Sequence, residues 1–387
     1  MNSSGMTNGQ LKTRRVIDAL EHRELDRVPM GEFFWTNFVR RVKQEMEVGD
    51  DFDPYRYWDL DMIVLVPNMD PHIKGIRVLE DTPERKVVKT GFEATIELRG
   101  TYPMPLYRDF DIKTYDQMET LEFDDPADDR RYFEAIDDQV NSVADALNLG
   151  IPSFEDRVNA LADDFCLFGS VCEPHETIWR IMGTENVLFK LGEDPDRMAS
   201  IIERLGDFLV GIVEGQIAAA AGKLSGLYIW GDVAYDKGMF FSPDYWRRAY
   251  KPPLKRICDA AHAAGLKTIY HGCGNASPVF EDMIEAGVDG YNPLEAKAGL
   301  DVVELKRRFG SRWAFNGNID VRVLATNDRD AIRREVLTKL NAAKGGGYIV
   351  QTDHSVPDNV APDSYDYMVR LVREYGGYPL DLGEFDS

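Results

Sequence analysis

The sequence lacks the features that mark exported and membrane-spanning proteins. Its first ten residues, MNSSGMTNGQ, have no charged stretch followed by an apolar one, so they do not resemble a signal peptide. No window approaches twenty apolar residues, and the best candidate, residues 208–222, contains Glu214 and Gln216 and is typical of a buried amphipathic helix. Only four of 387 residues are cysteines, without the spacing of a disulfide framework. We therefore expect a cytoplasmic protein with reduced thiols and no membrane association.

Basic residues are also scarce. Lys and Arg number 45 against 67 acidic residues, which gives a net charge of −22. Such a surface repels phosphate backbones, so nucleic acid is not an expected partner. Hydrophobic residues make up 44% of the chain, an ordinary share for a globular protein. The composition favours a protein that acts on a small-molecule substrate.

Eight short apolar runs, each followed by a helical pattern, predict the fold class. They are residues 28–34, 61–67, 164–171, 226–232, 267–272, 289–293, 312–317 and 346–352. Strands that alternate with helices pair in parallel, and eight such units predict an α/β fold of the (β/α)8 TIM-barrel class. A doubly wound open sheet is the alternative, but no G-x-G-x-x-G follows the first strand.

No linker rich in proline or serine divides the chain. We expect residues 1–10 to form a disordered tail and residues 11–387 a single barrel domain. An insertion separates the second and third strands. Its residues 85–103 alternate apolar and polar side chains, which predicts an antiparallel hairpin, and residues 120–160 are acidic and helical in pattern.

Polar side chains collect where the predicted strands end, which is where barrels of this class carry their chemistry. In chain order they are Asn68, Asp70, Glu173, His175, Asp232, His271, Cys273, Asn292, Glu295, Asn316, Asn318, Gln351, Asp353 and His354. Asp and Asn also cap helices, so Asp232, Asn292 and Asn318 are equally well explained as turn residues. The presence of three of the six histidines and one of the four cysteines favours a functional site.

The segment His271-Gly272-Cys273-Gly274 predicts a metal site. Residues i and i+2 of a strand share a face, so the imidazole and the thiol can converge on one atom, and the glycines leave room for it. Both groups are preferred ligands of zinc. The third expected ligand is His354, and three protein ligands leave the open position that marks catalytic zinc. The competing interpretation is a turn with an incidental thiol.

Several segments resemble the uroporphyrinogen decarboxylase superfamily, which includes zinc-dependent corrinoid:thiol methyltransferases. The resemblance runs from about residue 10 to residue 376 and is carried by FFSPDYWRRAYKPPLKRICDAAHAAG, YHGCGN, AGVDGYNPLEAKAGLDVVELKRRFG, FNGNID and GGGYIVQTDHSVPDNVAPDSYDYMVRLVREYG. It implies a (β/α)8 barrel. True decarboxylases carry an R-Q-A-G-R-Y stretch after strand one, whereas residues 34–38 here read FWTNF, and the predicted mouth is poor in the guanidinium groups that a porphyrinogen's carboxylates need.

The methyltransferase branch resembles the chain better through H-x-C-G. It implies an enzyme that transfers a methyl group between a corrinoid and a small thiol, with Zn held by His271, Cys273 and His354. Relatives place a cysteine where alignment puts His354, so the set departs from theirs. The expected catalytic carboxylates are Asp232, Glu173 and Glu295. The expected substrate-binding residues are Asn68, Trp230, Tyr235, Asn292, Asn316 and Gln351.

No D-x-H-x-x-G motif occurs, so a corrinoid would have to be supplied in trans by a partner protein. The family also suggests a homodimer. Two other functions stay open. One is decarboxylation of a tetrapyrrole or another carboxylate, with His354 as the proton donor. The other is a corrinoid-binding barrel without catalysis.

Overall fold

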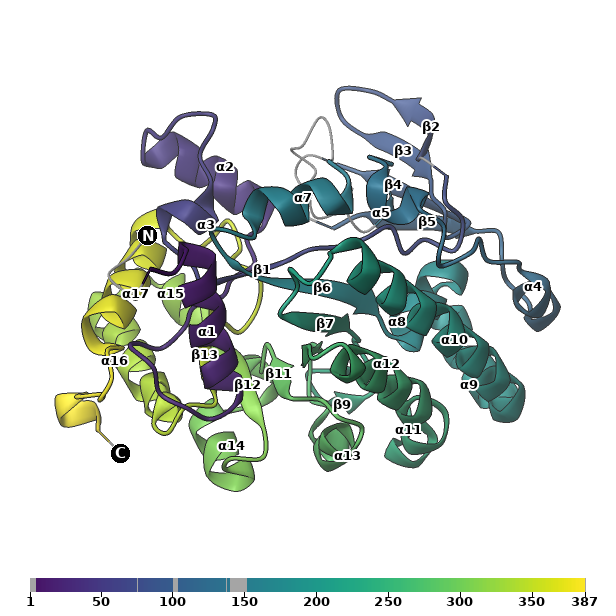
Figure 1. The fold of residues 1–387 in the computed structure, drawn as a ribbon. Helices are drawn as coiled ribbons and strands as arrows, with labels where there is room; N and C mark the ends of the chain where they lie inside the picture. The colour runs from purple at the N-terminus through teal and green to yellow at the C-terminus, as the bar shows by residue number, and fades with distance from the viewer. Residues whose placement is uncertain (1–4, 75, 100–103, 137, 140–151, 387) are drawn as a thin grey trace.

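A curled sheet of seven parallel strands forms the centre of the protein (Figure 1). The computed structural model describes residues 5–74, 76–99, 104–136, 138–139 and 152–386. In spatial order the strands are β1 (Met62–Val64), β6 (Cys166–Cys172), β7 (Gly226–Trp230), β10 (Lys267–His271), β11 (Gly290–Asn292), β12 (Ala314–Ile319) and β13 (Tyr348–Thr352). Each overlaps one of the predicted runs, which confirms the α/β class, and the curled parallel sheet is compatible with a TIM-barrel-like fold.

The first predicted strand is the exception. Residues 28–34 form only isolated parallel bridges, Met30 with Val350 and Phe34 with Val356. The backbone between them is nevertheless paired on both sides: the Gly31 N–H donates to the Val350 carbonyl at 3.0 Å, and the Asp61 N–H donates to the Met30 carbonyl at 2.8 Å. The segment therefore lies between β13 and the residue that precedes β1. The ladder is interrupted between the two bridges, where the Thr352 N–H donates to the Glu32 side chain at 3.3 Å and not to a main-chain carbonyl of the segment.

Helices cover the outer face of the sheet, with α10 and α12 on one side and α16 and α17 on the other (Figure 1). The helices outside the insertion are α1 (Asn8–Leu20), α2 (Thr36–Glu45), α3 (Pro54–Tyr57), α8 (Pro174–Met182), α9 (Thr184–Glu193), α10 (Pro195–Ala219), α11 (Pro243–Ala249), α12 (Lys251–Ala263), α13 (Phe280–Glu285), α14 (Val302–Phe309), α15 (Val321–Leu324), α16 (Arg329–Leu340) and α17 (Pro362–Tyr375). A short hairpin of β8 (Ala234–Tyr235) and β9 (Gly238–Met239) follows β7. None of the helices in the described ranges combines the length and apolarity needed to cross a bilayer.

Local capping sets where helices begin. The Ser242 hydroxyl accepts a hydrogen bond from the Tyr245 N–H at the start of α11, and Pro243 occupies the first helical position. Helix α1 begins at Asn8 because Thr7 and Gln10 form a reciprocal capping box. Residues 8–10 belong to this helix, so the disordered tail expected over residues 1–10 does not include them.

The chain between β1 and β6 forms a second, antiparallel sheet, which Figure 1 shows at the upper right. Its strands are β2 (Arg77–Asp81), β3 (Lys86–Lys89), β4 (Ala94–Leu98) and β5 (Leu106–Phe110), followed by α4 (Tyr115–Thr120), α5 (Arg130–Phe133) and α7 (Phe154–Leu161). Strands β3 and β4 pair within the range of the predicted hairpin. Part of the stretch predicted as helical, residues 140–151, lies outside the described residues.

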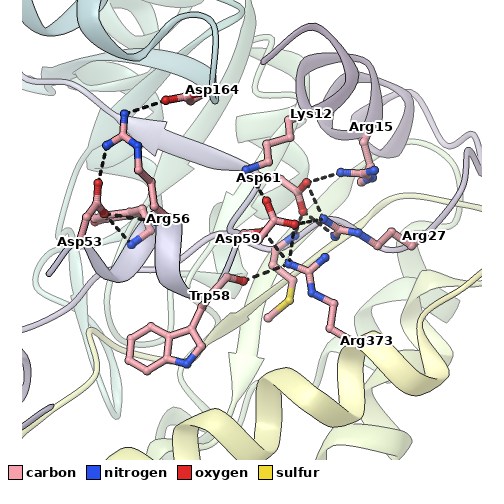
Figure 2. Close-up of polar contacts among 12 residues, drawn as sticks. Lys12, Arg15, Arg27, Asp53, Arg56, Trp58, Asp59, Asp61, Asp164 and Arg373 are labelled. Atoms are coloured by element: carbon pink, nitrogen blue, oxygen red, sulfur yellow. Dashed lines mark hydrogen bonds and ion pairs between the residues drawn. The ribbon is translucent and has the colours of Figure 1, made fainter. Parts of the chain in front are cut away.

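Asp61, directly before β1, ties three segments of the chain together (Figure 2). Its fully buried carboxylate accepts hydrogen bonds from Arg15 of α1 at 2.5 Å, Arg27 at 2.7 Å and the Met30 N–H at 2.8 Å. A carboxylate that has lost its water is stable only with such partners, because desolvation of an unpaired charge costs several kcal/mol. The network thus holds residues 27–30 against the amino end of β1.

We predict that Asp61→Asn lowers the free energy of unfolding by about 3–5 kcal/mol, since it removes the one fully buried counter-charge of Arg15 and Arg27 and leaves Arg15 only its pair with the half-exposed Asp26. The control is Asp164→Asn, which removes an ion pair with Arg56 whose side chains are 45% and 48% exposed; this change costs less than about 1 kcal/mol. Urea denaturation of both variants measures the difference, and equal losses would contradict the role given to Asp61.

Candidate metal site

His271 and Cys273 lie where β10 ends. The strand register sets His271 beside Trp230 of β7 and Asn292 of β11. The Cys273 Sγ lies 3.8 Å from the His271 Nε2. Zinc–ligand bonds of 2.0–2.3 Å place tetrahedral ligand atoms roughly 3.3–3.8 Å apart, so this separation suits two ligands of one ion. Gly274 has a φ of +78°, and a Cβ there would meet the backbone of Tyr235 at 2.6 Å, so the turn requires glycine.

Asn292 determines which nitrogen of His271 carries the proton. The Asn292 Nδ2 faces the main-chain carbonyl of Asn316 at 2.9 Å and the side-chain oxygen of Gln351 at 3.2 Å. A main-chain carbonyl can only accept, so the amide nitrogen must lie on that side and the amide oxygen must face His271. The Asn292 Oδ1 is 2.6 Å from the His271 Nδ1. Since an amide oxygen also only accepts, Nδ1 is the donor, and Nε2 keeps its lone pair beside the thiol.

Burial lowers the pKa of His271 to about 4, and the hydrogen bond to Asn292 opposes this only in part. The imidazole is therefore neutral at pH 7, which is the form that binds a metal. Both the tautomer and the neutral charge state leave the lone pair of Nε2 available to a metal ion.

Two carboxylates flank the thiol. The Cys273 N–H donates to the Asp232 Oδ1 at 2.8 Å, and the Gly274 N–H donates to the Glu295 Oε2 at 2.6 Å. Potential ligand atoms of Asp232, His271 and Cys273 all lie within 4.8 Å of one another, and the same holds for Cys273, Glu295 and His354. Cys273 belongs to both groups, whereas the two histidines are in different groups.

His354 follows β13, and a nitrogen of its ring lies within 4.8 Å of the Cys273 Sγ. Its ring stacks on Trp35, with centroids 5.8 Å apart and planes at 10°. Its Nδ1 lies 3.1 Å from the Ser355 carbonyl, which can only accept. The neutral ring therefore carries its proton on Nδ1, and Nε2 has the free lone pair here too.

Negative groups crowd around these side chains. Burial, followed by Asp232 and Glu295, raises the pKa of Cys273 well above its ordinary value. Burial and then Glu176 raise the pKa of Asp232 to about 7. Lys297 pairs with Glu295 at 3.0 Å. Nitrogen, sulfur and oxygen donors with surplus negative charge fit a divalent cation, because such an ion favours the deprotonated thiol and balances the carboxylates.

The other expected residues have different roles. The Trp230 ring packs 4.9 Å from the His271 ring, as an apolar wall would. Asn316 and Gln351 accept hydrogen bonds from the amide of Asn292, so they orient His271 indirectly, through that residue. Glu173 caps α8 by accepting from the Glu176 N–H at 3.1 Å, and burial raises its pKa well above the ordinary value.

Two further expected substrate-binding residues make side-chain contacts outside this cluster, although the Tyr235 backbone packs against Gly274 and its carbonyl accepts from the Asn275 N–H at 2.9 Å. Tyr235 is 46% exposed and stacks on Phe240, with centroids 5.8 Å apart. Asn68 exchanges backbone contacts with Arg131 of α5, and its side-chain oxygen accepts from the Asp70 N–H at 3.2 Å. A cavity of about 550 Å³ between β5, α8 and α9 is lined by none of the expected site residues.

Sequence reasoning missed the contribution of residues 32–35. The Phe33 ring lies 5.3 Å from Trp230 and 6.3 Å from His271, and Trp35 covers His354. Glu32 is a buried acid beside them. The sequence gives one sign of this contribution, because Glu32 is a charged residue within the apolar run VPMGEFF.

A curled parallel sheet with a polar cluster at its strand ends is an arrangement that many barrel enzymes share. A family model described as "Uroporphyrinogen decarboxylase (URO-D)" matches residues 111–375. The chain therefore belongs to the uroporphyrinogen decarboxylase family.

Individual relatives agree with this membership. A curated uroporphyrinogen decarboxylase of Streptomyces avermitilis is 28% identical over 180 residues, 46% of this chain and 47% of that protein. One of Pseudomonas entomophila is 25% identical over 274 residues, 68% of this chain and 69% of that protein. The chain thus spans about half the length of the first of these relatives. A methyltransferase from Methanosarcina mazei has a similar fold, with a TM-score of 0.65 and 16% identity over 96% of this chain and 99% of that one.

We predict that Asn292→Ala releases the His271 tautomer and weakens zinc binding roughly 10–100-fold, the usual cost of losing a group that orients a ligand. Long-range proton–nitrogen NMR of the metal-free protein should report protonation on Nδ1 in the wild type and a mixture of tautomers in the variant. Asn318→Ala, which removes a buried amide bonded to backbone groups of residues 294, 300 and 302, is the control and should leave the tautomer unchanged. An Nε2-protonated ring in the wild type would refute the assignment.

Proposed function

We propose that the chain is a zinc-dependent methyltransferase that transfers a methyl group between a corrinoid and a small thiol or related acceptor. The observation that carries the proposal is the lone pair of the His271 Nε2, aimed at the Cys273 thiol in a buried cluster of acids. Such a donor set suits a thiophilic metal better than it suits the binding of a polycarboxylate substrate. The fold of the Methanosarcina protein is compatible with this proposal.

Within it, His271, Cys273 and His354 would hold the zinc, and Glu295 or Asp232 would lie at the position that a substrate takes. When bound, zinc would lower the pKa of a thiol that reaches it. Asp232, whose pKa is raised to about 7, would accept the proton that the acceptor releases. Trp230 and Phe33 would exclude water from the side of β7.

The same proposal includes the parts that act around the site. We propose that the sheet closes as a (β/α)8 barrel, with residues 28–34 between β13 and β1 and the antiparallel sheet as a decoration. The corrinoid would come from a partner protein, and the chain would be able to form a homodimer. A corrinoid-binding barrel without catalysis would bind the cofactor and transfer nothing.

Decarboxylation is the second candidate, because the curated relatives are named uroporphyrinogen decarboxylases. In that case His354 would donate a proton and Cys273 would be incidental. Assays with uroporphyrinogen and with smaller carboxylates, measuring release of carbon dioxide, separate the two. Release that is unchanged in Cys273→Ser would favour this candidate over methyl transfer.

We predict about one zinc per chain in protein purified with zinc present, and loss of most of it in Cys273→Ser and His354→Ala, since each removes a ligand. Cys258→Ala removes a buried thiol of α12 and should keep full zinc. Elemental analysis measures the content, and circular dichroism checks the fold. Full zinc in both ligand variants would show that the ligand set is wrong.

We also predict that the zinc-loaded protein removes the methyl group of methylcobalamin in the presence of an accepting thiol from a panel. The absorbance change of the cobalamin follows the reaction, and Asp232→Asn should slow it with a smaller loss at high pH, where the thiol sheds its own proton. Methyl loss that is independent of both zinc and thiol would contradict the proposal.

A further inference from the structure

We propose that Glu32 is a positioning residue: it carries a proton and, through the hydroxyl of Thr352, holds the main chain at His354. The inference rests on the proposed function, because it gives Glu32 the task of placing a proposed metal ligand. It concerns a side chain that neither the sequence patterns nor the metal set includes.

Glu32 is 3% exposed and lies where three segments meet. Its Oε1 accepts from the Phe33 N–H at 3.0 Å and lies 2.7 Å from the Thr352 Oγ1 at the end of β13. Its Oε2 accepts from the Thr352 N–H at 3.3 Å and from the Tyr365 hydroxyl of α17 at 3.2 Å. The carboxyl group therefore bridges residues 32–33, β13 and α17.

Counting hydrogens at the Thr352 hydroxyl shows where a proton is needed. The Thr352 Oγ1 lies 2.7 Å from the Glu32 Oε1 and 2.5 Å from the His354 carbonyl. One hydroxyl hydrogen cannot serve two acceptors, and a carbonyl has no hydrogen to give. Both short contacts are favourable only if Glu32 donates to Thr352 while Thr352 donates to His354. An ionised Glu32 would leave one pair of oxygens in contact without a hydrogen between them.

The surroundings favour the neutral acid. The titratable groups that face Glu32 are Tyr365 of α17 and Tyr228 of β7, both neutral near pH 7. No lysine or arginine in the described part of the chain pairs with it. Burial raises the pKa of Glu32 to about 8, against the smaller opposing effect of its hydrogen bonds.

The same segment holds His354 in other ways. The Val356 N–H donates to the Phe33 carbonyl at 2.8 Å, the Trp35 N–H donates to the Val356 carbonyl at 3.2 Å, and the Trp35 ring stacks on the imidazole. The relay from Glu32 adds a hold on the carbonyl of His354 itself. Residues 32–35 thus place His354, the proposed ligand that follows β13, which explains why an acid is buried in an apolar run.

The test uses two matched pairs in the full chain. Glu32→Gln keeps a donor toward Thr352, whereas Glu32→Ala removes it; Thr352→Ser keeps the hydroxyl, whereas Thr352→Val removes it. We expect Glu32→Ala and Thr352→Val to weaken zinc binding roughly 10–100-fold and Thr352→Ser to stay near wild type. Glu32→Gln should lose clearly less than Glu32→Ala, because its amide nitrogen donates to Thr352 but cannot accept from the Phe33 N–H. Hydrogen exchange at residues 353–355 should speed up in the first two variants only.

The proton has its own readouts. The infrared difference between wild type and Glu32→Gln at pH 7 should contain the carbonyl stretch of a protonated carboxylic acid. Zinc affinity of the wild type should fall relative to Glu32→Gln as pH rises through about 8. The pKa of Glu32 is raised in the folded state, so unfolding releases its proton at pH values between the ordinary carboxyl range and about 8. As the pH rises through that range, the unfolding equilibrium of the wild type should shift toward the unfolded state relative to Glu32→Gln, by up to about tenfold per pH unit.

Absence of the infrared band, or equal losses in the conservative and the truncating variants, would overturn the proposal. Wild-type protein that binds no zinc would overturn the proposed function instead. In that case the infrared band and the exchange rates still decide whether Glu32 holds a proton and restrains residues 353–355.

Discussion

The orientation of one buried amide governs the chemistry of this site. The Asn316 carbonyl accepts only, so it fixes the amide of Asn292, and the amide oxygen then fixes the proton on the His271 Nδ1. The chain of constraints works because the register of β10, β11 and β12 brings their ends to one level. The lone pair beside Cys273 is thus a consequence of strand pairing, and it is set before any ligand arrives.

Around this amide, the protein accumulates groups that are costly to bury. A thiol, two histidines and several carboxylates share a small volume, and the pKa values of Cys273, His271 and Asp232 are displaced toward the neutral forms. In a protein interior such crowding is stable only if the groups stay neutral or share a cation. Glu32 follows the same principle outside this cluster. It is buried in the neutral form that we propose, and its proton links residues 28–34 to Thr352 of β13. The remainder of the fold, including the Asp61 network, keeps these segments in register.

Much of the fold could be predicted from the sequence, because buried parallel strands appear as short apolar runs between helical patterns. The prediction of a continuous strand was wrong at residues 28–34, where only isolated bridges form because the Thr352 N–H donates to the Glu32 side chain, although the run is apolar. At the site, His271 and Cys273 could be predicted from their spacing of two residues. The functions of Asn316 and Gln351 could not, because whether an amide faces a substrate or another amide depends on pairing across three strands. Glu32 was missed for the same reason: its partners come from β13 and α17, more than 300 residues away along the chain.

The most direct test of the central claim is an anomalous difference map from crystals of the zinc-loaded protein, measured on both sides of the zinc absorption edge. The account predicts one strong peak bonded to the His271 Nε2 and the Cys273 Sγ, with the Nδ1 still hydrogen-bonded to Asn292. A peak elsewhere in the molecule, or one coordinated through Nδ1 with the Asn292 amide reversed, would contradict it.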